Sequence, residues 1–158
     1  MIMDIGELLV RDGIVLKSGA SSKRQALHVL ANAAAQAMGQ DEVRVFDALM
    51  EREALGSTGL GSGVAVPHAR LAGLDSVKAV FVRLDTPVAY DSVDDRPVDL
   101  MFALFAPPRD GADHLRALAA VSRALRSPEL REQLRQARTV DAVHALFVRD
   151  ARAPATAA

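Results

Sequence analysis

Nine residues near the middle of this sequence, VDLMFALFA at positions 98–106, form an almost unbroken apolar run. A strand with one face in water alternates apolar and polar side chains, so a continuous apolar run predicts a strand that is covered on both faces. We therefore expect this segment to form a central strand of a sheet. The chain has 158 residues, half of them hydrophobic, which is enough for one domain whose core needs no metal or disulfide.

Other strand signals lie around this run. Residues 77–84, VKAVFVRL, are rich in β-branched and aromatic side chains and predict a second strand. Residues 13–16, GIVL, predict an edge strand or a turn, and residues 64–66, VAV, predict a brief strand that Pro67 stops. Residues 85–97 are rich in Asp and Pro and predict a loop with room for one short strand.

Helical patterns occupy both flanks of the strand region. Ser22 and Gln25 have the spacing of a capping box and predict a helix that Gly39 ends. Asp41 predicts the cap of a second helix that ends near residue 55. Three further helices are expected after the strands: one with the apolar stripe Leu115, Leu118, Val121 and Leu125, one that begins at Ser127 and Pro128, and one that Thr139 caps.

The order of these elements predicts the fold class. Helices, then strands, then helices indicate an α/β or α+β sandwich with a small mixed sheet. We find no internal repeat and no domain boundary, so residues 1–150 are expected to form a single domain. Residues 151–158, ARAPATAA, are expected to form a disordered tail.

The composition excludes several classes of protein. There is no cysteine, so disulfides, thiolate metal sites and a cysteine nucleophile are excluded together. The formal net charge is −1 and the lysines and arginines are mixed with acids, so no basic stripe indicates nucleic-acid binding. The first residues, MIMDIGELLVRDG, are acidic where a signal peptide is basic, and no apolar run has the length of a membrane span. We expect a cytoplasmic protein that binds any phosphate through a local site.

A glycine-rich segment, GSTGLGSGVAVPH at positions 56–68, is the best candidate for such a site. Glycines allow backbone N–H groups to converge on an anion. The spacing here fits neither a nucleotide-binding P-loop nor G-x-G-x-x-G. The motifs G-x-S-x-G and H-E-x-x-H are also absent, so a hydrolase elbow and a zinc hydrolase have no support.

His68 is the residue of this segment that is best suited to act in a chemical reaction. A neutral imidazole nitrogen is a good nucleophile toward phosphorus, and imidazole is largely neutral at cytosolic pH. Pro67 makes the approach to the ring rigid, the glycines can supply N–H donors, and Arg52 can supply a bidentate guanidinium. From the residues alone, a glycine-rich hairpin that carries a surface histidine remains an equal alternative.

Three segments carry a resemblance to a known family. REALGSTGLGSGVAVPHARL (52–71) is similar to an active-site signature with a Gly-Ser-Thr-Gly loop, an apolar run and a Pro-His pair. TPVAYDSVDDRPVDLMFALFAP (86–107) and HLRALAAVSRAL (114–125) follow in the same order and spacing. Together they resemble the enzyme IIA proteins of the bacterial phosphotransferase system, in the fructose, mannitol and nitrogen-regulatory branch. The likeness covers about residues 5–148 and is greatest to the nitrogen-regulatory type.

The resemblance implies a fold and a set of site residues. The fold is an α/β architecture in which helices on both sides sandwich a mixed central β-sheet. His68 matches the phosphorylated histidine, Arg52 matches an arginine beside the phosphoryl group, and His114 matches a second histidine near the site. The loop residues that line the phosphoryl pocket correspond to Ser57, Thr58, Gly59 and Gly61. The resemblance implies no metal and no cofactor. Three positions depart from the family pattern without removing a group that the chemistry needs: Ser62, Ala69 and Arg70.

The resemblance also implies a function. His68 would accept a phosphoryl group from a histidine-containing phosphocarrier protein, and the phosphorylation state would regulate partner proteins. The partners implied are potassium transporters, sensor kinases or metabolic enzymes, with no direct phosphorylation of sugar by this chain. The alternative within the family is a free-standing fructose- or mannitol-type component that passes the phosphoryl group to a IIB domain for sugar uptake.

Two readings outside this chemistry remain. The chain could be an interaction module that no longer takes phosphate, or a hydrolase that uses Ser62, His68 and an aspartate. His28 and His144 are expected at or near the surface and receive no role. A cluster of three aspartates is most simply interpreted as part of a solvated loop: Asp91, Asp94 and Asp95.

Overall fold

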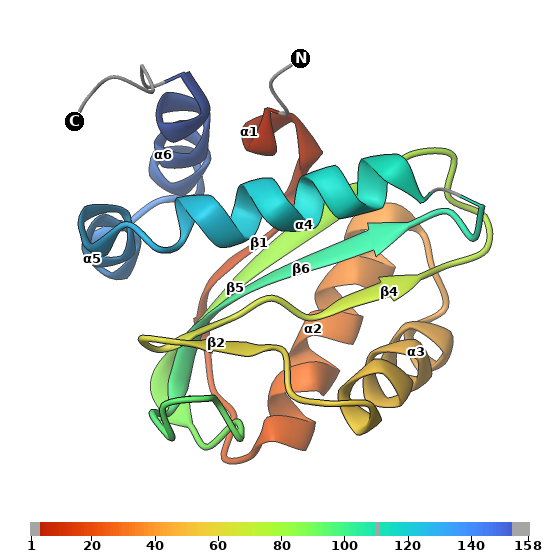
Figure 1. The fold of residues 1–158 in the computed structure, drawn as a ribbon, viewed down its shortest axis with the longest axis horizontal. Coiled ribbons are helices and arrows are strands. Elements are labelled where there is room, and N and C mark those ends of the chain that lie inside the picture. The colour runs from red at the N-terminus through yellow and green to blue at the C-terminus, as the bar shows by residue number, and fades with distance from the viewer. Residues whose placement is uncertain (1–3, 110, 153–158) are drawn as a thin grey trace.

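A computed structural model describes residues 4–109 and 111–152 (Figure 1). Helices cover both faces of one mixed sheet, which confirms the predicted α/β sandwich. In chain order the elements are α1 (Ile5–Leu8), β1 (Leu9–Ser18), α2 (Lys23–Met38), α3 (Glu42–Ala54), β2 (Gly59–Gly61), β3 (Val64–Ala65), β4 (His68–Arg70), β5 (Lys78–Val88), β6 (Val98–Ala106), α4 (Ala112–Ala124), α5 (Pro128–Gln136) and α6 (Val140–Arg152).

Strand β6 is the centre of the sheet. The strand order is β1-β5-β6-β3-β2, and β4 pairs with β6 beyond the end of β3. β5 pairs with β6 in the antiparallel sense, whereas β3 and β4 both run parallel to β6. Because β3 and β4 follow one another along the same edge of β6, the sheet carries the chain from the glycine segment straight into the strand that begins at His68.

The predicted central strand is confirmed, since eight of the nine residues of β6 are buried and Asp99 is the one of intermediate exposure. Its side chains alternate between two cores. Met101, Ala103 and Phe105 join the core under α2 and α3. Leu100, Phe102, Leu104 and Ala106 join the core under α4, α5 and α6. A strand that contributes to two apolar cores needs apolar side chains at successive positions, which explains the unbroken run.

The predicted helix boundaries are present in the structure. The Ser22 hydroxyl accepts a hydrogen bond from the backbone N–H of Gln25 at 3.2 Å, which begins α2. Gly39 ends α2 in the left-handed conformation at φ 68°, where glycine has no steric penalty. Asp41 caps α3 through the N–H of Val43. None of the helices in the described ranges is long and apolar enough to cross a membrane.

The structure extends the predictions at several places. The edge strand β1 begins at Leu9, well before the predicted residues 13–16, and the four-residue helix α1 was not predicted. β5 continues to Val88, inside the segment predicted as a loop. The division into a domain at 1–150 and a tail at 151–158 stays a prediction: α6 runs to residue 152, and the remaining residues lie outside those that the structure describes.

Candidate phosphoryl-transfer site

His68 lies on a strand held against the middle of the sheet. The residue is the first of β4 and pairs with Leu104 of β6. The carbonyl of Pro67 accepts a hydrogen bond from the N–H of Leu104 at 2.9 Å, so the approach to the histidine is also anchored. Its side chain remains partly exposed. The structure therefore places the predicted nucleophile on a rigid element, and not in the flexible part of the glycine segment.

Both ring nitrogens of His68 have polar neighbours. Nδ1 lies 3.0 Å from the carbonyl oxygen of Val66, which can only accept, so Nδ1 carries the proton. Nε2 accepts a hydrogen bond from Nε of Arg52 at 3.0 Å. In this tautomer the lone pair of the ring lies on Nε2 and accepts the hydrogen bond from Arg52. Nε2 is therefore the candidate nucleophilic atom of the ring.

The surroundings of His68 keep the ring neutral. Burial lowers the pKa of the imidazole below its ordinary value of 6.5, because burial disfavours the charged form. The hydrogen bond to Val66 opposes this shift, the positive charge of Arg52 adds to it, and the negative charge of Glu53 opposes it more weakly. The net direction is downward, so the neutral nucleophilic form predominates at neutral pH.

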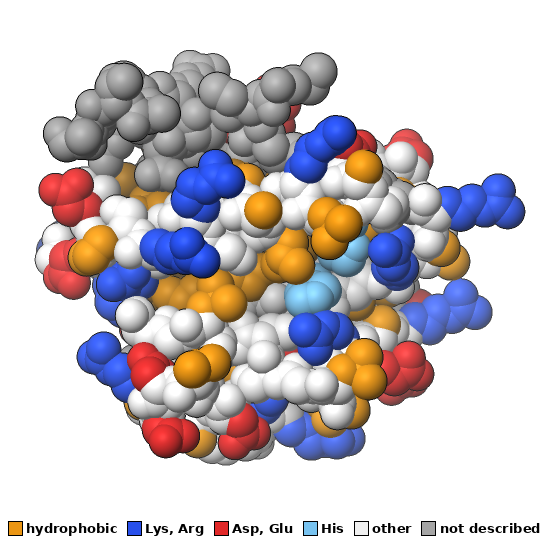
Figure 2. Space-filling view, in the orientation of Figure 1, with side chains coloured by type: hydrophobic (Ala, Val, Ile, Leu, Met, Phe, Trp, Pro, Cys, Tyr) orange, Lys and Arg blue, Asp and Glu red, His pale blue; other side chains and the backbone are white. Residues whose placement is uncertain are grey.

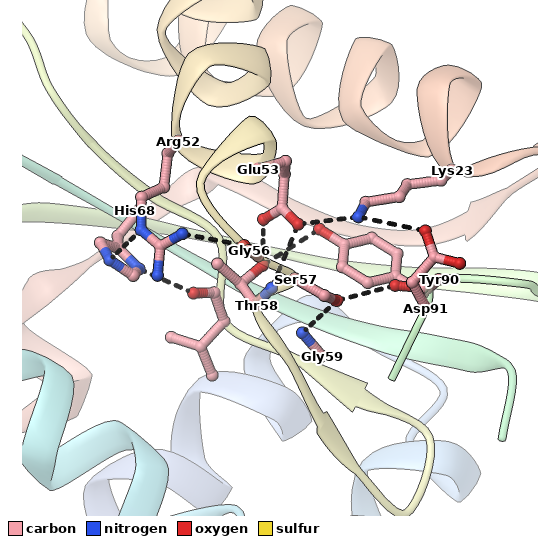
Figure 3. A network of polar contacts seen from close by, with 11 residues as sticks. Lys23, Arg52, Glu53, Gly56, Ser57, Thr58, Gly59, His68, Tyr90 and Asp91 are labelled. Carbon is pink, nitrogen blue, oxygen red and sulfur yellow. Dashed lines mark hydrogen bonds and ion pairs between the residues drawn. The ribbon is translucent and has the colours of Figure 1, made fainter. Parts of the chain in front are cut away.

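Arg52 connects the histidine to the glycine loop. It lies in the last turn of α3, and its Nη1 donates to the carbonyl oxygen of Gly56 at 2.9 Å while its Nε faces His68 (Figure 3). A guanidinium offers five N–H donors in a fixed plane, which suits the oxygens of a phosphoryl group. The predicted neighbourhood of Arg52 and His68 is present in the structure.

His114 is the third predicted site residue and also lies here. It occupies the first turn of α4 and is buried, with 8% of its surface exposed. Its ring centroid is 5.6 Å from that of His68, and the two planes meet at 73°. The structure thus brings together side chains from α3, β4 and α4 that are distant in the sequence.

The residues predicted to line a phosphoryl pocket have a second role. The Ser57 hydroxyl donates to the carbonyl oxygen of Tyr90 at 2.8 Å and accepts from the N–H of Gly59 at 3.1 Å. The N–H of Thr58 donates to Glu53 at 3.1 Å. These donors are used inside the loop in this structure. Gly61 lies further along, in the hairpin that β2 forms with β3. The contact of these residues with a phosphoryl group stays a prediction.

Three residues that the sequence analysis missed support the loop. Glu53 accepts hydrogen bonds from both the N–H and the hydroxyl of Thr58. Lys23 Nζ, from α2, lies 3.0 Å from Oε1 of Glu53 and 4.6 Å from the centroid of the Tyr90 ring (Figure 3). The Tyr90 hydroxyl lies 3.2 Å from Oγ1 of Thr58. Only weak features of the sequence could have indicated these residues: Glu53 is next to Arg52 in the chain, and Tyr90 is the only tyrosine.

The hydrogen-bonded tip of the hairpin argues against the hydrolase interpretation. Ser62 has φ 57°, its N–H donates to Asp94 at 2.8 Å, and its carbonyl accepts from Arg135 at 2.9 Å. These contacts tie its backbone to Asp94 and Arg135, whereas the ring nitrogens of His68 bind Val66 and Arg52. Backbone N–H donors lower the pKa of the exposed Asp94 carboxyl. Asp94 is therefore more than a solvated loop residue, because it holds the hairpin turn.

The other two histidines lie away from this cluster. His28 is exposed on α2 and stacks on Phe46, with ring centroids 3.7 Å apart. His144 lies on α6, and its Nε2 is 2.9 Å from the carbonyl oxygen of Gly6. Within residues 4–109 and 111–152, no group of three or more His, Asp or Glu side chains is arranged to hold a metal ion.

The surface around the histidines is mixed in character. Figure 2 shows histidine atoms at the surface between α4 and the region of α3 and β4, with Lys and Arg side chains and hydrophobic side chains beside them. Two large exposed hydrophobic side chains adjoin site residues in the chain: Leu55 directly follows α3, and Leu115 follows His114 in the first turn of α4.

Comparison with known proteins gives consistent matches over nearly the whole chain. The family model for the phosphoenolpyruvate-dependent sugar phosphotransferase system, EIIA 2, matches residues 7–149. A nitrogen regulatory protein of Bradyrhizobium diazoefficiens is 44% identical over 156 residues, which are 99% of this chain and 100% of that protein. A fructose-specific EIIA component of Haloferax volcanii is 32% identical over 143 residues, which are 90% of this chain and 93% of that protein.

A solved structure agrees with these matches. The crystal structure of the nitrogen regulatory protein IIA-Ntr from Neisseria meningitidis superimposes with a TM-score of 0.85 at 34% sequence identity. The superposition covers 90% of this chain and 98% of the Neisseria chain. The sheet, the helices on its two faces and the strand that carries His68 are therefore compared over almost their full extent.

Proposed function

Since the chain belongs to the EIIA 2 family of the phosphoenolpyruvate-dependent sugar phosphotransferase system, we propose that it is a phosphocarrier that holds a phosphoryl group on His68. The observation that carries this proposal is the state of the His68 ring. Nδ1 is occupied by its hydrogen bond to Val66, the lone pair on Nε2 accepts only from the Arg52 side chain, which can turn aside, and burial favours the neutral form. A nucleophile for phosphorus needs these three properties.

The transfer step follows from this geometry. The lone pair of Nε2 attacks the phosphorus of a phosphohistidine on the donor protein; the new N–P bond forms while the donor N–P bond breaks, and the donor nitrogen keeps the electron pair. Positive charge develops on the His68 ring as the bond forms. The carbonyl oxygen of Val66, 3.0 Å from Nδ1, stabilises that charge through the Nδ1–H hydrogen bond.

Arg52 changes partner during the step. Before transfer its Nε donates to Nε2 of His68, the atom that the phosphorus must reach. When a phosphoryl group occupies that atom, the guanidinium can donate to the phosphoryl oxygens instead, while Nη1 remains anchored to Gly56. The Arg52 side chain thus orients the His68 ring before transfer and stabilises the transferred phosphoryl group afterwards.

The phosphoryl donor we propose is a histidine-containing phosphocarrier protein, in the cytoplasm. Leu55, three residues after Arg52, and Leu115, next to His114, are exposed and offer apolar contact area for such a partner. A phosphoryl group adds nearly two negative charges to this small surface, enough to create or abolish an interface. The nitrogen regulatory relatives favour such a regulatory role. The targets we propose are the ones that the family resemblance implies: potassium transporters, sensor kinases or metabolic enzymes.

A second candidate function has its own support. The match to a fructose-specific EIIA component favours a chain that passes the phosphoryl group from His68 to a IIB domain for sugar uptake. The two candidates share the acceptor atom and the donor, and they differ in what receives the phosphoryl group from this protein.

The test is phosphotransfer from phosphoenolpyruvate through purified enzyme I and carrier protein. Wild type and His28→Ala, a surface control, should acquire an acid-labile and alkali-stable label, whereas His68→Ala should acquire none. Adding a fructose-type IIB domain then separates the two candidates, because only a transport component loses its label to that domain. If the charged carrier leaves wild type unlabelled, the phosphocarrier proposal fails and the interaction-module interpretation gains.

A further inference from the structure

A buried ion pair lies beside the site and has no part in the transfer step derived above. Its carboxylate belongs to Glu53, whose side chain is 5% exposed, and its cation is Nζ of Lys23 at 3.0 Å. Lys23 comes from the first turn of α2, whereas Glu53 belongs to the last turns of α3. A buried carboxylate is strongly unfavourable unless a cation and hydrogen bonds accompany it, so this pair calls for an explanation.

Glu53 controls the shape of the loop after α3. Its two oxygens accept from the N–H and the hydroxyl of Thr58, which closes a ring of residues 53–58. Gly56 lies inside that ring, and its carbonyl oxygen accepts from Nη1 of Arg52 at 2.9 Å. A series of contacts therefore runs from Glu53 through the loop to Arg52 and ends at Nε2 of His68.

Lys23 holds the other side of the same loop. Its Nζ lies 4.6 Å from the centroid of the Tyr90 ring, and the Tyr90 hydroxyl is 3.2 Å from Oγ1 of Thr58 (Figure 3). Its ion pair to Asp91 is longer, at 3.8 Å, and more exposed. The lysine thus contacts two of the groups that fix Thr58.

We propose that Lys23 and Glu53 are positioning residues for the phosphoryl site: Glu53 holds the loop that orients Arg52, and Lys23 cancels the negative charge that Glu53 would otherwise direct against a phosphoryl group on His68. This inference rests on the proposed function. Glu53 is needed as a loop anchor, but an anion beside a dianionic group is repulsive. The half-buried ammonium group of Lys23, 3.0 Å from Glu53, keeps the anchor and offsets the repulsion.

The charge of Glu53 is felt at the histidine. Two charged groups of α3, Arg52 and Glu53, act on the His68 ring, and the ring of His114 from α4 packs edge-on against it. The carboxylate raises the pKa of the His68 imidazole and the guanidinium lowers it. A charge that acts on the ring also acts on a phosphoryl group attached to that ring.

A charge-balance experiment tests the proposal. The rate of labelling of wild type by charged carrier is compared with Lys23→Met, Glu53→Gln and the double variant. Lys23→Met should be slowed about tenfold, the effect of one uncompensated charge near the reacting group. The double variant should be clearly faster than Lys23→Met, because glutamine can still accept from Thr58 and brings no charge. If the double variant is as slow as Lys23→Met, charge cancellation is overturned.

Two control variants separate positioning from folding. Lys23→Arg keeps a cation at the same place and should remain within about threefold of wild type. Lys17→Met removes an exposed lysine of β1 and should leave the rate unchanged. Urea unfolding of each variant accompanies the rates, and a Lys23→Arg variant that folds but loses the rate as fully as Lys23→Met contradicts the proposal.

A further readout does not depend on the carrier protein. NMR titration of the unphosphorylated protein should place the pKa of His68 lower in Glu53→Gln than in wild type, because a nearby negative charge has been removed. Phosphoramidate, a small chemical donor, then phosphorylates His68, and ³¹P NMR should show faster loss of the group from Lys23→Met than from the double variant. An unchanged His68 titration overturns the inference even if wild type accepts phosphate. Failure of the carrier alone counts only against the proposed function.

Discussion

The hydrogen bond between Arg52 and His68 joins the two side chains on which the proposed chemistry depends. Nε of Arg52 donates a hydrogen bond at 3.0 Å to Nε2 of His68, the nitrogen that we propose attacks phosphorus. The guanidinium is thus already within reach of any phosphoryl group that arrives there. Its position follows from the loop carbonyl that holds its other end.

Replacing Arg52 should therefore slow phosphorylation more than it alters the fold. Arg52→Gln should reduce the rate of labelling by about 10²–10³, the usual effect of one lost donor to a transition-state oxyanion. It should also raise the pKa of His68, since the arginine charge lowers that pKa. Rapid-quench labelling and NMR titration measure the two effects.

Arg44→Gln is the matched control for this variant, because Arg44 is exposed on the same helix. It should label at the wild-type rate. Equal rates for Arg52→Gln and wild type would remove Arg52 from the site.

The titration of His68 gives a second prediction, on how its acceptance of phosphate depends on pH. The folded-state pKa lies below 6.5, mainly because burial disfavours the imidazolium. Acceptance of phosphate should therefore be retained at neutral pH and be lost as the pH falls through the lowered pKa, because the imidazolium has no free lone pair. An NMR titration of the ring gives the midpoint directly. A midpoint at or above 6.5 would contradict the geometry described here.

Among the elements, the β2–β3 hairpin is held by side chains from elsewhere in the chain. Gly63 follows its turn with φ +81°, a conformation that favours glycine. A Cβ at this position would lie 2.4 Å from Nη2 of Arg135 and 3.0 Å from Oδ1 of Asp99. Those two side chains form an ion pair, and the arginine also donates to the hairpin carbonyl of Ser62, so they cannot simply move away.

Gly63→Ala should accordingly destabilise the protein. The positive φ alone costs about 1–3 kcal/mol for a residue other than glycine, and the clash with the ion pair adds to that. Gly19→Ala, where a Cβ would meet nothing within 4 Å, should stay within about 0.5 kcal/mol of wild type. Urea unfolding followed by circular dichroism compares the two. Equal stability of the two variants would mean that the hairpin has no such constraint.

The elements differ in how readily sequence predicts them. The central strand, the caps of α2 and α3 and the stop at Gly39 were predictable, because each depends on residues that are close together in the chain. The end of β5 was not predictable: residues 85–87 are exposed, so no apolar alternation marks them as strand. Helix α1 is only four residues long and shows no repeating pattern.

The candidate site divides in the same way. His68 and Arg52 were identified from the residues around the glycine segment and His114 from the family pattern, and the structure brings the three together. Lys23 and Glu53 were missed, because an ion pair between two helices leaves no spacing rule in the sequence. Residue patterns predict contacts along an element, and contacts between elements require the fold.

At the scale of the whole molecule, one sheet separates two apolar cores. β6 contributes side chains to both, and Tyr90, the only tyrosine, belongs to the core under α2 and α3. Phe102 belongs to the opposite core, where its ring packs against Phe147 with centroids 5.0 Å apart. Because both cores use the same strand, neither can lose its packing alone.

Phe102→Ala tests this coupling. The cavity should lower the free energy of unfolding by about 3–5 kcal/mol. Tyrosine fluorescence reports on the far core, and far-ultraviolet circular dichroism reports on the helices of both layers. The two signals should shift together to one lower urea midpoint. Two separate transitions would show that the layers unfold independently.

Placing His68 on a strand also has a consequence for timing. Ordering a backbone segment costs conformational entropy. Because His68 lies on β4, its backbone is already ordered by folding, and no such cost is added when a donor protein binds. An encounter then waits only for the Arg52 side chain to release Nε2 of His68. The exchange of phosphate between two such proteins should thus be set by how often they collide in the right orientation, and so by viscosity and ionic strength more than by any internal rearrangement.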